Sequence, residues 1–539
     1  MLHFIPKSVS HIFPSSSLCD PLLLRKFSAL PVSFDEKHVI ASYDDLCSTF
    51  SKLPTRLNFR RIDSRSQLDP SIRSALDKIS PSKKELPSMK YLYRIINGPS
   101  SSHTGGPTAA CNIVKKENPG VNHYRVHLFG SLADTGKGHF TDIAIVNTLA
   151  PASVTIEWHY KQDLEGKECG MLFEALSGPP TTSPEILSTT KFWSIGGGAL
   201  EDKNGIIDET KGTKYKEMHL RDVHSILDEC ETSGRPLHEL IFAADLPDLR
   251  EHLHKVWAAM KDSIHRGLKE TDVLPGTLRY PRRACNTYRR AMQMHPSTNA
   301  TVKIMAYALA VSEENACGHV VCTAPTCGSC GVLPGLLYHM QEELKVSDDD
   351  IVDALATAGV FGNAAKTDAT IAGSKAGCQA EVGVAVAMAA AAATFLLGGS
   401  ARVIEKAAQS GLESMLGLSC DPVEGYVQIP CIERNALGAT RAMSCSMLAL
   451  AQTDPDHFVS YDATLLSMLV TGILMDESLK ERSDGGLAQI VPQGKGLITE
   501  DRDKVYGLIK LLAKARLARN QDQRPIDISG YEDIVPEIE

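Results

Sequence analysis

The residues best suited to chemistry are three cysteines spread over one stretch of the chain. Cys378 stands in the segment GCQAEVG, Cys420 in CDPVEG and Cys431 in IPCIERNA. A local zinc site takes its ligands in pairs two to four residues apart, and these cysteines are much farther apart. They can share a metal only if the fold brings them together. Their spacing alone favours three small apolar side chains that fill a core.

A second cysteine group has a sharper local pattern. Cys322, Cys327 and Cys330 show the C-x4-C-x2-C interval that is typical of plant-type ferredoxins. By spacing alone this group is the stronger metal signal. It therefore stands as a rival site.

Two histidine segments add candidate acid–base groups. His103 lies in GPSSSHTGGP, where the run from Ser100 to Gly106 predicts a polar loop whose hydroxyls and N–H groups can bind a carboxylate. His139 follows a predicted strand, Tyr124 to Phe129, and a glycine-broken loop, and it precedes a helix-like segment. The positive end of a helix dipole disfavours imidazolium, so the pattern predicts a neutral imidazole that can act as a base.

These segments closely resemble blocks of the iron–sulfur L-serine dehydratases, also called L-serine ammonia-lyases. The resemblance covers GPSSSHT, the TGKGH and TDIAI segments around His139, the three cysteine blocks in their order, and a closing block from Glu481 to Ala488. It spans roughly residues 90 to 490. It implies that Cys378, Cys420 and Cys431 hold a [4Fe-4S] cluster with one open iron, which is a Lewis acid. The implied reaction is dehydration and deamination of L-serine to pyruvate and ammonia.

The resemblance also suggests roles for residues near the histidines. His139 is the first choice for the base that takes the Cα proton, and His103 is the second. The residues expected to bind the carboxylate or orient the amine are Ser100, Ser101, Ser102, Thr104, Lys137 and Lys366.

Two alternative functions are also compatible with the sequence. One is a related lyase, an L-cysteine desulfidase that releases sulfide. The other is a non-catalytic iron–sulfur or zinc sensor protein built on Cys322, Cys327 and Cys330. Pyridoxal phosphate needs a Schiff-base lysine and a phosphate cup, and nothing in the sequence calls for it.

Composition limits the class of partner. The chain has 539 residues, 43% hydrophobic and 22% charged, with a net charge of −9. This balance argues against a nucleic acid or an anionic membrane as partner, and it favours a small molecule, L-serine.

The apolar run from Val382 to Leu397 is shorter than a bilayer span and predicts a buried core helix. A homodimer is the expected assembly on general grounds.

The expected fold class is α+β, with an N-terminal α/β-type domain and a mostly α-helical catalytic domain that holds the cluster. The expected segments are a transit peptide at 1–30, an N-terminal extension at 31–88, a serine dehydratase beta-type domain at 89–245, a helical linker at 246–275, an alpha-type cluster domain at 276–498 and a C-terminal helix and tail at 499–539. The histidine segments lie in one domain and the cluster cysteines in the other, so the active site is expected at the interface.

The chain ends carry two further expectations. The first thirty residues are Ser-rich and basic with a single acid, Asp20, which is typical of a mitochondrial presequence; otherwise this segment is a tail without an address and the protein is cytoplasmic. Bacterial relatives close with a cysteine-bearing tail, whereas the last cysteine here is Cys445. We therefore expect solvent or a small anion on the open iron.

The interval from Asp142 to Trp193 is short for the family, which suggests that an insertion subdomain is missing.

Overall fold

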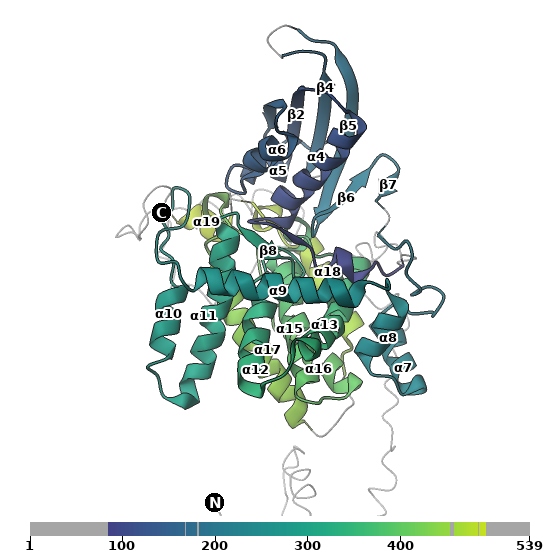
Figure 1. The fold of residues 1–539 in the computed structure, drawn as a ribbon, viewed down its shortest axis with the longest axis vertical. Coiled ribbons are helices and arrows are strands. Elements are labelled where there is room, and N and C mark those ends of the chain that lie inside the picture. The colour runs from purple at the N-terminus through teal and green to yellow at the C-terminus, as the bar shows by residue number, and fades with distance from the viewer. Residues whose placement is uncertain are drawn as a thin grey trace, which may run out of the picture. The chain divides into compact units, whose positions relative to one another are not determined.

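The computed structural model describes residues 85–167, 169–179, 183–207, 209–452, 458–482 and 485–491, all within one compact unit, Pro70–Glu539. The expected presequence, the remainder of the N-terminal extension up to residue 84, and the expected C-terminal helix lie outside the described residues. The described part has a small mixed sheet near its N-terminal end and helices after it, which confirms the α+β prediction (Figure 1).

The N-terminal part is built on a six-stranded sheet. Its strands are β2 (His123–Phe129), β3 (Ser153–His159), β4 (Gly170–Leu176), β5 (Ile186–Gly196), β6 (Ala199–Asp202) and β7 (Gly205–Ile206), in the order β3-β2-β4-β5-β6-β7. The pair β2–β3 is parallel and the others are antiparallel. Alternate residues of β2, namely Tyr124, Val126 and Leu128, are buried against α4 (Gly106–Glu117) and α6 (Thr141–Leu149), as the alternating pattern predicts.

The turn after β5 is built from three consecutive glycines. Gly196, Gly197 and Gly198 all have positive φ, at 99°, 61° and 80°. Side chains other than glycine rarely adopt this backbone conformation. The triple glycine therefore forms the tight turn into β6.

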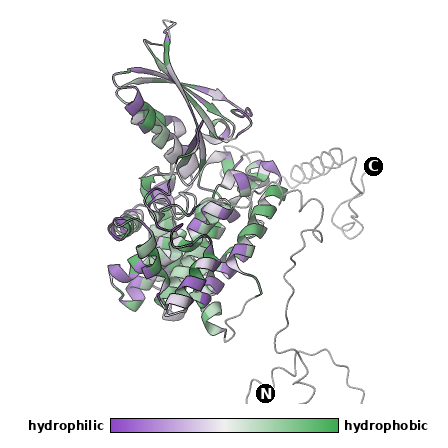
Figure 2. Cartoon of the chain, turned by 90° about the vertical axis from the view of Figure 1, so that its right-hand side faces the viewer, coloured by the Kyte–Doolittle hydropathy of each residue, from purple (hydrophilic) through white to green (hydrophobic). Residues whose placement is uncertain are grey.

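The larger part of the chain is a layered bundle of helices. Its helices are α7 (Val223–Ser233), α8 (Leu237–Ala244), α9 (Leu249–Gly267), α10 (Ala284–Ala291), α11 (Pro296–Ala316), α12 (Val332–Leu344), α13 (Asp348–Asp368), α14 (Gly373–Ala376), α15 (Val384–Leu396), α16 (Ala401–Glu413), α17 (Cys431–Ala451), α18 (Tyr461–Leu474) and α19 (Gly486–Ile490). Within the helical linker expected at 246–275 lies α9, which crosses the other helices (Figure 1). Figure 2 shows hydrophobic residues concentrated in the packed helices.

Helix α15 lies at the centre of this bundle, between α13, α16 and α17. Its alanines allow close approach, because a Cβ added at Gly411 of α16 would lie 3.0 Å from the Ala387 Cα. Together with the π-helical turn η5 (Gln379–Gly383) it is the one described helix apolar and long enough to cross a bilayer, yet 83% of that stretch is buried inside the protein. The prediction of a core helix is confirmed.

The two parts are joined by a short antiparallel sheet. Strand β1 (Ile95–Asn97) pairs with β8 (Val320–Cys322), which directs the chain after β1 onto the helical bundle. Gly98 sits so close to α11 that an added Cβ would lie 2.4 Å from the Asn315 carbonyl oxygen. In the same way, a Cβ at Gly138 would lie 2.7 Å from the Gly425 carbonyl oxygen. Both histidine segments are thus fixed against the cysteine-bearing part.

Candidate active site

His103 belongs to a short helical turn rather than to the predicted polar loop. The Ser101–Gly105 segment is a π-helix, η3, capped by Ser100, whose Oγ accepts a hydrogen bond from the His103 N–H at 3.0 Å. The loop prediction was wrong because this hydroxyl satisfies the free N–H at the start of the turn. The imidazole is buried, with Nδ1 2.8 Å from Ser102 Oγ and Nε2 3.0 Å from Ser131 Oγ. Both ring nitrogens of His103 therefore have a hydroxyl partner.

His139 lies in the turn between α5 (Ser131–Thr135) and α6, and its surroundings determine its tautomer. Its Nδ1 is 2.9 Å from the Thr135 carbonyl oxygen. Since a carbonyl only accepts, Nδ1 carries the proton and Nε2 keeps a lone pair. Burial lowers the pKa of His139 to about 4, against a smaller opposing effect of the Thr135 carbonyl. The ring is neutral as predicted, but burial is the main cause rather than a helix dipole.

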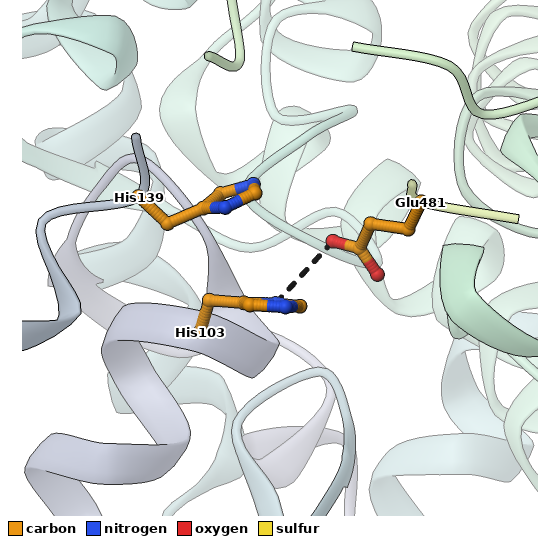
Figure 3. Close-up of side chains that lie close together, drawn as sticks. All are labelled: His103, His139 and Glu481. Atoms are coloured by element: carbon orange, nitrogen blue, oxygen red, sulfur yellow. Dashed lines mark ion pairs between the residues drawn. The ribbon is translucent and has the colours of Figure 1, made fainter. Parts of the chain in front are cut away.

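The two rings face a carboxylate from far along the chain (Figure 3). The His103 and His139 rings stack with their centroids 4.4 Å apart, and Glu481 Oε1 lies 3.4 Å from His103 Nδ1. His103, His139 and Glu481 each offer one possible metal-ligand atom, and these three atoms lie within 4.8 Å of one another. Burial lowers the pKa of His103 well below its usual range, and the neighbouring His139 lowers it further. The imidazoles are therefore neutral at physiological pH.

The backbone of Glu481 is tied to one of the candidate cluster cysteines. Cys420 N–H donates to the Leu479 carbonyl, and Glu481 N–H donates to the Cys420 carbonyl, each at 2.7 Å. Glu481 also has a φ of 54°, which is uncommon for a residue other than glycine. Such backbone conformations are found at sites where the surrounding structure imposes them. This arrangement holds the Glu481 carboxylate near the histidines and its backbone near Cys420.

The three candidate cluster cysteines lie near one another: Cys378 and Cys420 belong to one group of close ligand atoms, and Cys420 and Cys431 line one cavity. Cys378, Cys420 and Cys431 are buried, and none is in a disulfide. Ligand atoms of Cys378, Glu381 and Cys420 lie within 4.8 Å of one another. A hydrogen bond with Cys378, followed by burial, raises the pKa of the Cys420 thiol, while burial and then the charge of Cys378 raise the pKa of Cys431. Buried thiolates this close together require a cation, and soft sulfur ligands suit iron.

Glu381 occupies a space that two glycines leave open. A Cβ at Gly373 would lie 2.8 Å from Glu381 Oε2, and a Cβ at Gly328 would lie 3.2 Å from either carboxylate oxygen. Burial, and then the charge of Glu481, raise the pKa of Glu381 to about 8. The two carboxylates are therefore close enough to repel each other.

A small cavity joins the histidine and cysteine groups. Its described lining residues are Pro99, Ser100, His139, Gly328, Glu381, Cys420, Pro422, Val427, Cys431 and Glu481. It thus combines an imidazole with a free lone pair, two thiols of the candidate cluster, a serine hydroxyl and two carboxylates. These groups suit proton abstraction next to a metal centre.

Other predicted substrate-binding residues are placed differently. Ser102 contacts His103, whereas Ser101 and Thr104 support the backbone: the Ser101 carbonyl accepts from Gly106 N–H, and Thr104 Oγ1 donates to the His139 carbonyl at 2.7 Å. All three are buried.

The structure does not bring the two predicted lysines to the cavity. Lys137 is exposed, with Nζ 5.6 Å from the centroid of the Trp158 ring. Lys366 donates to the Tyr91 carbonyl at 3.1 Å and forms an ion pair with Glu209 beside a different cavity. Neither lysine lines the small cavity between the histidine and cysteine groups.

The rival cysteine group is an apolar packing unit. Cys327 and Cys330 are buried in a hydrophobic cluster with Ile264 and Val321. Among the described residues, the groups of three ligand atoms within 4.8 Å of one another are the two given above, and Cys322, Cys327, Cys330 and Cys431 belong to neither. The structure therefore accounts for Cys327 and Cys330 as core side chains without requiring a metal.

Sequence reasoning missed the two carboxylates. Glu381 stands inside GCQAEVG and Glu481 opens the closing block, so both were in segments that carried the family resemblance. The sequence feature that could have identified these two carboxylates is the acidic residue that each block contains. No spacing rule connects them, because the connection is made by the bridge between the Cys420 and Lys480 backbones.

Comparison with known proteins agrees with this arrangement. The family model described as serine dehydratase beta chain matches residues 88–155, and the one described as serine dehydratase alpha chain matches residues 195–488. The chain is 35% identical over 443 residues to L-serine dehydratase 1 of Escherichia coli, 34% over 448 residues to the L-serine dehydratase of Haemophilus influenzae and 35% over 451 residues to that of Streptomyces coelicolor. Each alignment covers 74% of this chain and 97% of the relative. The chain therefore belongs to the serine dehydratase family.

Proposed function

We propose that this protein is an L-serine ammonia-lyase, which converts L-serine to pyruvate and ammonia. The observation that carries the proposal is the single cavity onto which His139, Cys420, Cys431 and Glu481 all open. Each comes from a block shared with the L-serine dehydratases, and residues far apart in sequence meet there. The similarity to the L-serine dehydratases also identifies the protein as a lyase, which argues against a non-catalytic sensor.

The buried thiols of Cys378, Cys420 and Cys431 have the chemistry that an iron–sulfur cluster requires. We propose that they hold a [4Fe-4S] cluster, since three thiolates leave one iron without a protein sulfur. When bound, the cluster supplies a Lewis acid that helps the β-hydroxyl to leave. Arg434 donates to the Ser419 carbonyl at 2.5 Å and so ties the Cys431 helix to the segment that carries Cys420.

His139 is the residue placed to take the Cα proton. Its Nε2 lone pair is available at neutral pH because Nδ1–H is bonded to the Thr135 carbonyl and burial keeps the ring neutral. His103 packs against it and is itself held by Ser102 and Ser131. Ser100 offers a hydroxyl to the substrate carboxylate. Loss of the Cα proton and of hydroxide gives aminoacrylate, which tautomerises and hydrolyses to pyruvate and ammonia.

The test is turnover by protein reconstituted with iron and sulfide without oxygen. L-Serine should give pyruvate and ammonia in equal amounts, and L-cysteine should react more slowly. Faster release of sulfide from L-cysteine would identify a desulfidase instead. Absence of pyruvate from iron-loaded protein would refute the proposal.

Two expectations outside the described site remain proposals. We propose that the protein forms a homodimer, which light scattering of the purified protein tests. We also propose that residues 1–30 direct it to the mitochondrion. A fluorescent fusion with and without these residues tests this, and unchanged cytoplasmic fluorescence would refute it.

A further inference from the structure

A second, larger cavity lies where the sheet part of the chain meets the helical part. Its volume is about 660 Å³, within the range of roughly 300 to 1,000 Å³ that is usual for small-molecule sites. One side is formed by the end of β5 and the start of β6, and the other by the end of α13 and the residues that follow it. None of its described lining residues lines the cavity between the histidine and cysteine groups. The two cavities are therefore separate sites.

The acidic side chains of this larger cavity already have basic partners. Each of its three glutamates forms at least one ion pair within the described part of the chain. These pairs are Glu85 with Lys216, Glu201 with Lys167, and Glu209 with both Lys366 and Arg94. Because each carboxylate has its own cation, the glutamates do not call for a cationic ligand.

Lys375 is a cation of the cavity that has no such partner. It lies in α14, is exposed, and forms no ion pair with any residue that the structure describes. Two buried threonines line the same cavity. Thr367 Oγ1 has no hydrogen-bond partner among the described residues, and a helical threonine has two accessible χ1 rotamers through which it can turn to a ligand. Thr370 Oγ1 accepts from the Ala372 N–H at 3.1 Å, so its own proton can be donated. An ammonium and two hydroxyl donors together suit an anion.

Much of the remaining lining is apolar. It includes Ile195, Ala199, Ile207, Ala369 and Ile371. Mostly apolar walls with a few polar groups are the usual composition of a site for an organic molecule. An inorganic anion gains nothing from these side chains, whereas a hydrocarbon chain covers them and removes apolar surface from water. The ligand that fits both features is an anion with a hydrocarbon chain.

We propose that this cavity binds a monocarboxylate with a hydrocarbon chain. The carboxylate accepts hydrogen bonds from Lys375, Thr367 and Thr370, and the chain lies against the isoleucines. Such a ligand contacts the β5–β6 side and the α13 side at once. Its binding to the folded protein therefore stabilises the contact between the sheet part and the helical part. This inference does not depend on the reaction proposed above.

The test is calorimetry of the iron-loaded enzyme with hexanoate, 1-hexanol and inorganic phosphate. The cavity between the histidine and cysteine groups has a volume of only about 10 Å³, which is too small for a six-carbon chain. Hexanoate should bind at one equivalent per chain, roughly 10-fold more tightly than 1-hexanol, as expected for a charge-assisted hydrogen bond. It should also raise the melting temperature. Phosphate, which has no chain, should bind more weakly than hexanoate.

Three variants connect the binding to this cavity. Lys375→Met should remove the preference for hexanoate over 1-hexanol, and this exposed position tolerates the change without loss of the fold. Thr367→Val, which keeps the shape of the side chain, should weaken hexanoate binding by about 3- to 10-fold. Lys269→Met is the control, because Lys269 is exposed and does not line the cavity, and it should keep the wild-type preference.

Three results would overturn the proposal. Equal affinity of the wild type for hexanoate and 1-hexanol would show that the carboxylate is not recognised. Tighter binding of phosphate than of hexanoate would show a site for inorganic anions. A preference for hexanoate that survives in Lys375→Met would place the carboxylate elsewhere on the protein.

Discussion

Replacing His139 by alanine removes the only imidazole lone pair that the structure leaves available in the described cavity. Both nitrogens of His103 have hydroxyl partners, Ser102 and Ser131, so His103 cannot take over the role without breaking one of these contacts. A positioned general base contributes about 10²- to 10⁴-fold, which corresponds to about 3 to 5 kcal/mol in the activation free energy. We therefore expect His139→Ala to lose turnover by about this factor while keeping its iron.

The assay measures pyruvate formation and, separately, exchange of the serine α-hydrogen with deuterated solvent. His139→Ala should lose both, whereas His265→Ala, a surface histidine beside Tyr338, should lose neither. Exchange that persists in His139→Ala and disappears in His103→Ala would show that His103 is the base. Loss of iron from His139→Ala would instead show a structural role.

Three further predictions follow from the same geometry. The neutral form of His139 is needed for activity and its pKa is lowered to about 4, so kcat/KM should stay high as the pH falls through 6.5 and should decline only toward pH 4; a decline centred near 6.5 would contradict the burial of this ring. Lys366→Met should remove one of the two cations that pair with the buried Glu209 carboxylate, the other being Arg94, and so destabilise the protein by about 2 kcal/mol without raising the KM for serine; a raised KM at unchanged melting temperature would show that Lys366 contacts the substrate. Gly138→Ala places a Cβ 2.7 Å from the Gly425 carbonyl oxygen, so turnover should fall by at least about 10-fold through displacement of the adjacent His139 loop; wild-type turnover would show that the loop adapts.

The parts of the fold that the sequence predicted are those with a strong local pattern. Alternation in His123–Phe129 gives β2, and apolar residues every three or four positions give α9. The alanine-rich run in α15 is buried because small side chains allow neighbouring helices to approach. In each case the local pattern and the tertiary packing agree.

The parts that could not be predicted depend on tertiary contacts. Lys366 looked suited to a carboxylate, but its charge is taken up by Glu209, which is distant in sequence. The hydroxyl-rich segment after Ser100 forms a π-helix because side-chain capping and packing outweigh its weak helical propensity. Glu481 reaches the site through backbone pairing with Cys420, which leaves no trace in residue spacing.

The most direct test of this account is the iron content of single cysteine variants purified without oxygen. We predict about four iron atoms per wild-type chain. Cys378→Ala, Cys420→Ala and Cys431→Ala should each lose the cluster and its visible absorbance, whereas Cys327→Ala, whose thiol packs in an apolar cluster, should keep both. Full iron in Cys420→Ala, or one zinc and no iron in the reconstituted wild type, would contradict the assignment of the site.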